Sequence, residues 1–399
     1  MGYIYGLPDS AAEIMLRLES AGYEAYCVGG CVRDKLLGKE PADWDICTSA
    51  APDETLGVFS EYRTIPTGLK HGTVTVLCKG EPFEITTYRI DGDYTDGRHP
   101  DSVSFTRSLR DDLMRRDFTV NAMAADARGC VRDYYGGEID LAKKILRAVG
   151  NAEKRFSEDA LRILRAVRFS AVLGFEIEES TANAARALKS TLDKVSRERI
   201  YTEIRKLLCG EYAAETLASF SDIIAAAIPQ LESESIKNAA ALIGELPREL
   251  CVRLAALLRG LTEEKADAAL RELKAPNDIR KTALKLIESS KRPIPEERST
   301  LKRKLDELLP VWNEAAAINE ALFGKSRTES ANALKDSILS RKECYTLKAL
   351  DINGSELCGR CGIKGKQTGE ILSRLLDAVI DGRLPNEKEK LLDAAKAML

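Results

Sequence analysis

The sequence predicts an α+β protein in which a small mixed-sheet domain at the N-terminus is followed by an all-α remainder. Up to about residue 140, short β-branched or aromatic runs bounded by turn residues alternate with helical segments. From Ser157 onward, Ala, Leu, Arg, Lys and Glu dominate, and prolines mark the breaks between helices. No fixed-period repeat is visible, which excludes a regular solenoid. A chain of 399 residues is long enough for about two to four domains.

Composition excludes several classes of protein. The formal net charge is −3, so an RNA partner would have to bind a local basic patch. The ten cysteines show no framework spacing and no secretory signal is visible, so we expect reduced thiols in a cytoplasmic protein. No apolar run reaches membrane-spanning length, so we expect no membrane partner. His71 and His99 are the only two histidines, which excludes a histidine-rich metal centre.

The first elements in chain order are a helix and a series of strands. Residues 9–21 have the pattern of an amphipathic helix, capped by Asp9 or Ser10 after Pro8. Beyond the segment 27–48, the β-branched and aromatic runs predict three further strands, at residues 62–66, 73–78 and 83–88.

The segment 27–48 (CVGGCVRDKLLGKEPADWDICT) carries the strongest chemical pattern. It predicts a buried strand, a Gly-Gly turn, a short helix and a second strand that carries Asp43 and Asp45. Side chains alternate along a strand, so these carboxylates project from the same face and repel each other unless a cation lies between them. A hard divalent ion such as Mg²⁺ binds one or two carboxylates and keeps places for phosphate oxygens.

An anion-binding turn precedes the two aspartates. Gly29 and Gly30 let backbone N–H groups approach an anion closely, and Arg33 adds a positive fork. An anion site beside a metal pair indicates phosphoryl or nucleotidyl transfer. The string GG-x-VRD-x-LLG followed by D-x-D resembles motif A of the nucleotidyltransferase superfamily, and more narrowly that of the bacterial tRNA nucleotidyltransferases (CCA-adding enzymes) and poly(A) polymerases. The alternative is a glycine turn followed by two solvated aspartates.

This resemblance implies a nucleotidyltransferase head that binds two Mg²⁺ ions through Asp43 and Asp45. Family members carry an acidic residue in an E-x-T-x-x-R string, which here makes Glu84 a candidate third carboxylate. A solvent-facing strand glutamate is the alternative. Residues 90–105 are rich in Gly and Asp and predict a mobile loop, which by the resemblance would help to switch from C to A addition. From composition alone, an ordinary connector explains this segment better.

Residues 115–122 (RRDFTVNA) resemble motif B of the same family. The resemblance implies that Arg116 holds the triphosphate. Asp117 and Asn121 offer acceptors and donors suited to ribose hydroxyls. The alternative is a salt-bridge cluster at a helix start, with Asp117 as the cap.

Residues 133–140 (DYYGGEID) resemble motif C, which couples head and neck in the family. Its chemistry is expected to be structural. Gly136 and Gly137 supply a turn, and Asp140 is predicted to cap the next element.

Residues 157–169 (SEDALRILRAVRF) are predicted to form one helix. Asp159, Arg162, Arg165 and Arg168 recur every third residue and form a stripe along it. Seen alone, this stripe is a solvated charged face. It resembles motif D of the family, which implies that the first two residues select the nucleotide and that Arg165 and Arg168 contact phosphate.

An acid and a guanidinium can choose between bases without a nucleic-acid template. Cytosine and adenine both present an amino donor beside a ring-nitrogen acceptor, so Asp159 can accept from the first and Arg162 can donate to the second. Guanine and uracil present a carbonyl and a ring N–H there, and each mismatch costs on the order of 1–3 kcal/mol.

The C-terminal segment 351–372 is interrupted by glycines. Lys364 and Lys366 flank an expected helix start, where backbone N–H groups and two lysines could bind RNA phosphate. The resemblance implies that this tail contacts the tRNA elbow; a packing corner between helices is the alternative. Cys358 and Cys361 form a lone CxxC that lacks further zinc ligands and a thioredoxin-like setting, so we interpret them as incidental.

These observations lead to one hypothesis and its rivals. The expected division is a head (1–140), a neck that selects nucleotides (141–205), a body (206–320) and a tRNA-binding tail (321–399). The expected activity is template-independent addition of CMP and AMP to tRNA 3′ ends from CTP and ATP, with release of pyrophosphate by two-metal nucleotidyl transfer. A poly(A) polymerase or an enzyme adding only CC or only A has the same motifs. A non-catalytic tRNA-binding protein is the remaining rival, and no obligate protein partner is evident.

Overall fold

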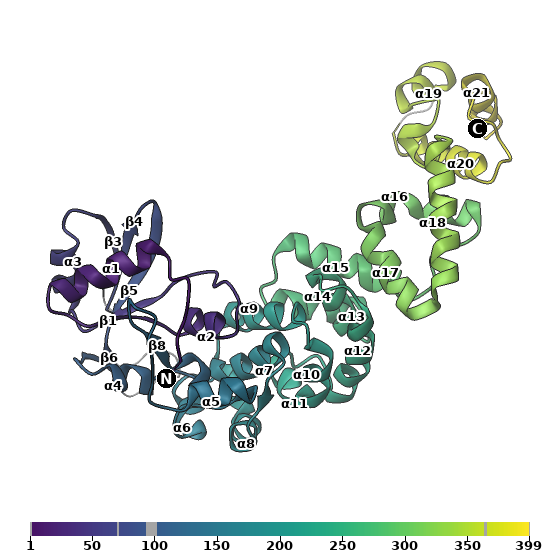
Figure 1. Ribbon diagram of the computed structural model, residues 1–399. Coiled ribbons are helices and arrows are strands. Elements are labelled where there is room, and N and C mark those ends of the chain that lie inside the picture. Colours follow the sequence, from purple (N-terminus) through teal and green to yellow (C-terminus); the bar gives the residue numbers. More distant parts are fainter. Residues whose placement is uncertain (1, 70–71, 93–101, 363–364, 399) are drawn as a thin grey trace. The chain divides into compact units, whose positions relative to one another are not determined.

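The chain contains two compact units in a computed structural model that describes residues 2–69, 72–92, 102–362 and 365–398 (Figure 1). Unit 1 comprises residues 1–237 and 272–274, and unit 2 comprises residues 238–271 and 275–399. The finer division into head, neck, body and tail stays a prediction.

Unit 1 is built on a mixed sheet, as the sequence predicts. Strand β2 runs parallel to β5, and all other neighbours in the sheet are antiparallel. In spatial order the strands are β3 (Arg63–Gly68), β4 (Thr73–Cys78), β5 (Glu81–Thr87), β2 (Ile46–Thr48), β1 (Ala25–Val28), β8 (Met123–Ala125) and β9 (Val131–Asp133).

The two faces of this sheet are covered by different helices. On one face, α1 (Asp9–Ser20) packs on β1 and β2, and α3 (Pro52–Val58) packs on β4 (Figure 1). On the other face, Val28 and Cys47 pack against Leu109 and Leu113 of α4 (Leu109–Met114). The predicted helix at 9–21 is therefore confirmed, and its hydrophobic stripe is buried.

The predicted caps of two helices are wrong. Pro8 is the N-cap residue of α1 without a side-chain cap, because the Ser10 hydroxyl donates instead to Glu81 at 2.9 Å. Asp140 lies inside α5 (Gly137–Ala142), where it accepts from the Thr119 hydroxyl at 2.7 Å. Asp133 binds the first N–H groups of α5 in its place.

Asp43 and Asp45 lie just before strand β2 and not within it, which corrects the sequence prediction. The reason is the length of the partner strand: β1 ends at Val28, whose N–H donates to the Asp45 carbonyl at 3.0 Å. The turn at Gly29, which has a positive φ of 84°, ends the pairing on the β1 side, and the pairing with β5 begins only at Ile46.

The described ends of the predicted loop at 90–105 pair with each other. Strand β6 (Arg89–Asp91) runs antiparallel to β7 (Val103–Phe105). Residues 93–101, which hold most of the predicted mobile loop, lie outside the described residues.

The rest of unit 1 is helical except for one short strand pair, β10 (Ile145–Leu146) with β11 (Glu176–Ile177), which the sequence did not predict. Its remaining helices are α2 (Gly30–Leu36), α6 (Ala152–Glu158), α7 (Leu161–Leu173), α8 (Glu179–Ala187), α9 (Arg197–Leu208), α10 (Ala213–Ser219) and α11 (Ser221–Ala227), with the 3₁₀ segments η2 (Thr119–Asn121) and η3 (Lys189–Lys194).

The predicted single helix at 157–169 is broken in two. Helix α6 ends at Glu158, and α7 starts at Leu161. Asp159 between them has an extended backbone, and its carboxylate accepts from the Leu161 N–H at 3.0 Å. This bond from the backbone to a side chain competes with the backbone hydrogen bonds of a continuous helix, so a new helix starts at Leu161.

Unit 2 is all-helical in its described residues. From α12, which crosses the boundary between the units, the helices are α12 (Ser233–Glu245), α13 (Leu250–Leu258), α14 (Glu263–Glu272), α15 (Asn277–Ser289), α16 (Arg298–Leu308), α17 (Trp312–Phe323), α18 (Lys325–Ser340), α19 (Gly354–Cys361), α20 (Lys366–Ile380) and α21 (Lys388–Ala397). Leu357, Leu375 and Leu391 join α19, α20 and α21 in one apolar cluster. Within the described ranges, no helix combines the length and apolarity needed to cross a membrane.

Candidate active site

Asp45 and Glu84, two of the predicted metal-binding carboxylates, lie on the sheet face that α4 covers. The register pairs Ile46 with Ile85, so Asp45 and Glu84, one residue earlier on each side, are neighbours on the opposite face from those buried side chains. Burial raises the pKa of the Asp45 carboxyl, and the charges of Asp43 and Glu84 raise it further. A site that disfavours its own negative charge suits a bound cation.

These residues fit a metal ion that is coordinated partly by the protein and partly by a bound substrate. In the described parts of the chain, no three His, Cys, Asp or Glu side chains are grouped to hold a metal ion by themselves. Asp43 and Asp45 both keep exposed surface, so phosphate oxygens can reach them, although the surrounding protein partly desolvates the Asp45 carboxyl. Mg²⁺ is commonly held in this way, by one or two carboxylates plus substrate phosphate.

The Gly-Gly turn brings the backbone close to Arg116. A Cβ atom at Gly29 would lie 3.1 Å from Arg116 Nη1, which is tighter than ordinary packing. The positive φ of Gly29 also disfavours any residue with a Cβ atom at this position. The Nε atom of Arg116 is buried and has no hydrogen-bond partner among the residues the structure describes. Arg116 also lowers the pKa of Asp45, against the effect of burial. The guanidinium therefore lies beside both the turn and Asp45.

Asp112, which the sequence reasoning missed, anchors this arginine. Its carboxylate is fully buried and accepts from Arg115 at 2.8 Å and from Arg116 at 3.3 Å. Burial would raise the pKa of Asp112, but the two arginine charges outweigh it and the pKa is lowered. The signal was present in the sequence, because Asp112 stands three and four residues before the arginines, a spacing that places them on one side of a helical turn.

Arg33 is held by neighbours within the protein. Its Nη1 donates to the Asn121 side chain at 2.6 Å, and its Nε donates to Asp34 at 2.9 Å. Its guanidinium also lies 5.2 Å from the ring centroid of Phe169. In this structure Arg33 thus connects α2 to η2 and α7.

Asp117 joins the predicted motif B to α7. It accepts from Asn121 Nδ2 at 3.1 Å and from Arg165 at 2.6 Å. Burial would raise the pKa of this carboxyl, but the pKa is held at about 2. The largest lowering effect is the charge of Arg165, followed by the hydrogen bond from Asn121. Asp117 is therefore ionised at neutral pH and fixes the position of Arg165.

The two residues predicted to select the base bind different partners. Asp159 accepts from Arg199 of α9 at 2.7 Å. Arg162 donates to the Glu158 carboxylate at 2.7 Å, to the Arg155 carbonyl at 3.0 Å and to the Arg115 carbonyl at 2.9 Å.

The last arginine of the stripe is similarly enclosed. Arg168 donates to Glu203 of α9 at 2.9 Å and lies 3.6 Å from the ring centroid of Phe169. The stripe is therefore a set of bonded side chains: each of its three arginines has an acidic partner, and Asp159 has a basic one.

Comparison with known proteins finds matches along most of this chain. The poly A polymerase head domain family matches residues 25–147, and tRNA nucleotidyltransferase domain 2 matches residues 248–395. The CCA-adding enzyme of Ligilactobacillus salivarius is 38% identical over 412 residues, covering 99% of this chain and 98% of that protein. The one of Geobacillus thermodenitrificans is 38% identical, with 96% and 95% covered. The chain belongs to the family of the CCA-adding enzymes.

Solved structures of that family share the fold. The Bacillus stearothermophilus CCA-adding enzyme in complex with CTP has a TM-score of 0.80 and 34% identity, with 98% of each chain covered. A Thermotoga maritima CCA-adding enzyme complexed with tRNA has a TM-score of 0.68 at 22% identity and covers both chains completely.

The tail residues predicted to bind RNA are only partly described. Lys366 is the first residue of α20, after Gly365 with a positive φ of 65°. Lys364 lies outside the described residues. Cys358 and Cys361 lie in the last turns of α19, and every cysteine in the chain is a free thiol.

Arg199, Glu158 and Glu203 were also missed from sequence. Arg199 and Glu203 are 40 and 35 residues from their partners in the chain. Only the i, i+4 spacing of Glu158 and Arg162 could have been recognised locally.

Proposed function

We propose that the protein adds CMP and AMP to the 3′ ends of tRNA, using CTP and ATP and releasing pyrophosphate by two-metal nucleotidyl transfer. One observation, on the consecutive residues Arg115 and Arg116, carries this proposal. The Arg116 side chain lies at the Gly-Gly turn beside Asp45, while the Arg115 carbonyl binds Arg162. A candidate metal-binding group and a candidate base-selecting group therefore both lie beside residues 115 and 116. The names of the relatives, and the CTP in the Bacillus stearothermophilus structure, support the same activity.

In this proposal each group has a defined task. Asp43 and Asp45, with Glu84 as a further candidate, hold two Mg²⁺ ions. When bound, these ions make the primer 3′-hydroxyl easier to deprotonate and neutralise charge on the triphosphate. Gly30, Arg33 and Arg116 orient the triphosphate.

Selection of the base falls to Asp159 and Arg162. Both oxygens of Asp159 already accept one bond each, from Leu161 and Arg199, so the carboxylate is held in one orientation. Each oxygen keeps a second lone pair, which can accept from the amino group of cytosine or adenine. The Arg162 guanidinium donates to the ring nitrogen, and guanine and uracil offer it no acceptor in that place.

Incorporation assays test the activity directly. The purified protein is incubated with tRNA transcripts that end before the first C, after CC, or after the complete CCA, each with a single NTP. We expect CMP on the first transcript, AMP on the transcript ending in CC, and no extension of the one ending in CCA. A protein that binds these transcripts but extends none of them would contradict the proposal.

Replacing Arg162 tests the selection of the base. Arg162→Met should lower the preference for CTP over UTP by about 5- to 150-fold, because one mismatched polar pair costs on the order of 1–3 kcal/mol. The matched control is Arg186→Met, which removes the same charge from unit 1 at a side chain that contacts Asp222 and Phe220. An unchanged CTP/UTP ratio in the first variant would refute the pairing argument.

A poly(A) polymerase is the second candidate, because the head matches the poly A polymerase head domain. The same assays separate the two. Repeated AMP addition to a transcript that already ends in CCA would favour the polymerase.

A further inference from the structure

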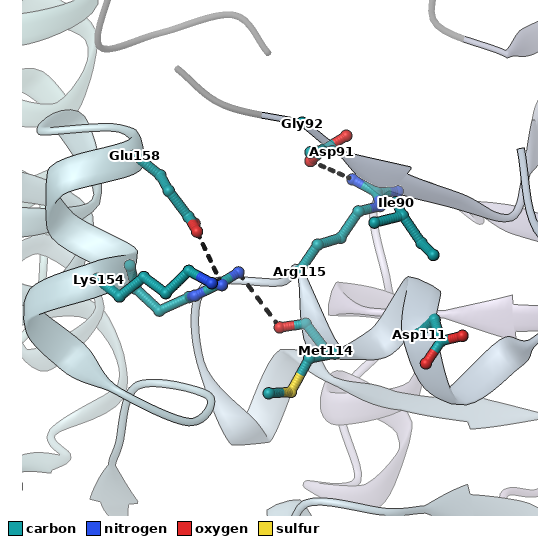
Figure 2. A pocket seen from close by; sticks show the side chains of 9 residues that line it. Ile90, Asp91, Gly92, Asp111, Met114, Arg115, Lys154 and Glu158 are labelled. Atoms are coloured by element: carbon teal, nitrogen blue, oxygen red, sulfur yellow. Dashed lines mark hydrogen bonds and ion pairs between the residues drawn. The ribbon is translucent and has the colours of Figure 1, made fainter. Parts of the chain in front are cut away.

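A cavity of about 360 Å³ lies in unit 1 between β6, α4 and α6, and none of the site residues predicted from sequence lines it. Its volume falls within the roughly 300–1,000 Å³ of small-ligand sites. Figure 2 shows Lys154 extending from α6 toward Met114, the last residue of α4, and Arg115, which follows it.

The charges that line the cavity are balanced, but one cation and one anion are free. Arg115 binds Asp91 at 3.7 Å in addition to the buried Asp112, and Arg155 binds Glu158 at 2.8 Å. Among the residues the structure describes, the Lys154 ammonium has no ion pair or hydrogen bond, and neither does the Asp111 carboxylate across from it. The cavity therefore offers one uncommitted positive charge.

Two apolar side chains complete the lining. Ile90 is 47% exposed and Met114 is 42% exposed, and both belong to the cavity wall (Figure 2). Large apolar side chains left exposed inside a cavity indicate a ligand with a flat or apolar face. Together with one free ammonium and one free carboxylate, they match a nucleotide with a single phosphate charge.

We propose that this cavity binds one unpaired nucleotide at the 3′ end of the RNA, with its phosphodiester on Lys154 and its base against Met114 and Ile90. The inference rests on the proposed function, because it presumes an RNA substrate. Asp111 accepts from a ribose hydroxyl or a base amino group. A free NTP fits less well, because its triphosphate would meet only one uncommitted cation and would face Asp111.

The cavity also adjoins the proposed base-selecting residue. The carbonyls of Arg115 and Arg155 and the carboxylate of Glu158 all accept from Arg162. These three residues line the cavity as well. An RNA nucleotide held there lies next to the group that recognises the incoming base, which is where the primer end has to be.

RNA binding without NTP tests the phosphate contact. The anisotropy of a fluorescent tRNA transcript ending before C is titrated with the full-length protein at several salt concentrations. Lys154→Ala should raise the Kd by about tenfold, the value of one charged hydrogen bond. It should also reduce the slope of log Kd against log salt by about 0.7, because one single-strand phosphate contact is lost. The matched control is Lys143→Ala, which removes an exposed lysine outside the cavity and should leave both values unchanged.

Three outcomes would overturn the inference. Lys154→Ala could leave the Kd and the salt slope unchanged, or it could change both no more than Lys143→Ala does. It could also raise the KM for CTP as much as the KM for RNA, which would make the cavity a site for free nucleotide. Because the binding assay contains no NTP, a protein that binds RNA but adds nothing would refute the proposed function and still test the cavity.

A second variant tests the base contact. Met114→Ala should weaken binding of the intact transcript several-fold. The same variant and the wild type should bind equally when the contacted nucleotide is abasic, since the side chain then has no base to cover. Transcripts with one abasic residue at each unpaired position locate that nucleotide, and equal weakening on every abasic transcript would show that Met114 acts only on the fold.

Discussion

The two units of the chain place their carboxylates differently. In unit 1, Asp112, Asp117, Asp140 and Glu203 are each at most 8% exposed, and each binds an arginine. In unit 2, no aspartate or glutamate among the described residues is buried, and its acid–arginine pairs lie near the surface.

The difference indicates what each unit contributes. A buried ion pair adds little net stability, but it fixes the orientation of both groups once its hydrogen bonds are satisfied. Unit 1 has such pairs where nucleotides would be oriented. The apolar cluster of unit 2 around Leu375 stabilises a fold without fixing any charge. We therefore expect substitutions of these residues in unit 1 to affect chemistry, and substitutions in unit 2 to leave the chemistry unchanged.

The largest expected effect is on activity in unit 1. Asp45→Asn should lower kcat for CMP addition by at least about 10²-fold, because it removes charge where the transferring phosphate is stabilised. Stability should not fall, since the raised pKa shows that the ionised carboxyl is unfavourable in the folded state. The rate is measured by single-nucleotide extension and the stability by urea unfolding.

The matched control for this comparison is Asp377→Asn in unit 2. Its carboxylate is exposed and pairs with Arg303, and its substitution should leave kcat unchanged. Retained turnover in Asp45→Asn would remove the distinction between the units.

Stability should show the next largest effect, again in unit 1. Asp117→Ala should lower the free energy of unfolding of unit 1 by about 3–5 kcal/mol, because it leaves Arg165 without its buried partner. Asp381→Ala in unit 2 breaks ion pairs of an exposed carboxylate with Arg303 and Arg383 and should leave the urea midpoint unchanged.

The two tryptophans allow the units to be measured separately. Trp44 lies in unit 1 and Trp312 in unit 2. In a Trp312→Phe background the remaining fluorescence of Trp44 reports the unfolding of unit 1, and in a Trp44→Phe background that of Trp312 reports the unfolding of unit 2. Equal losses in Asp117→Ala and Asp381→Ala would show that burial of the carboxylate does not matter.

A core substitution in unit 2 gives the converse result. Leu375→Ala should destabilise unit 2 by about 2–5 kcal/mol, since Leu375 is fully buried in the cluster. The Trp312 transition should shift to lower urea, while the KM for CTP stays the same. A changed KM for CTP would contradict the assignment of nucleotide binding to unit 1.

The sequence predicted several strands of the sheet in unit 1, because strands follow from local patterns. Strand β4 has its predicted bounds, and the alternation at 83–88 correctly placed Glu84 on the face opposite Ile85. Asp43 and Asp45 were misplaced into a strand because β1 ends at Val28 and the pairing with β5 begins only at Ile46, limits that the residues themselves do not show.

The candidate site was harder to predict because its geometry depends on distant partners. The period of three in residues 159–168 suggested one continuous stripe, but the Asp159 carboxylate binds the Leu161 N–H and Arg199 of α9. That arginine is 40 residues away, so a local pattern could not reveal the break. Asp112 was within reach of local reasoning, from its spacing to Arg115 and Arg116.

The smallest expected effect is a pH dependence that belongs to Asp117. Its pKa is about 2 in the folded state, below the ordinary value of about 3.9, so ionised Asp117 stabilises the fold above pH 4. This contribution is lost as the pH falls toward 2, and on the order of 1 kcal/mol should be gone by pH 3. The measurement compares the Trp44 unfolding transition of the wild type and of Asp117→Asn at pH 7 and pH 3.

The difference in unfolding free energy between the two proteins should be smaller at pH 3 than at pH 7. It should persist in 0.5 M salt, because a buried pair is screened much less than an exposed one. A difference that disappears in salt at pH 7 would mean that the pair behaves like the exposed pairs of unit 2.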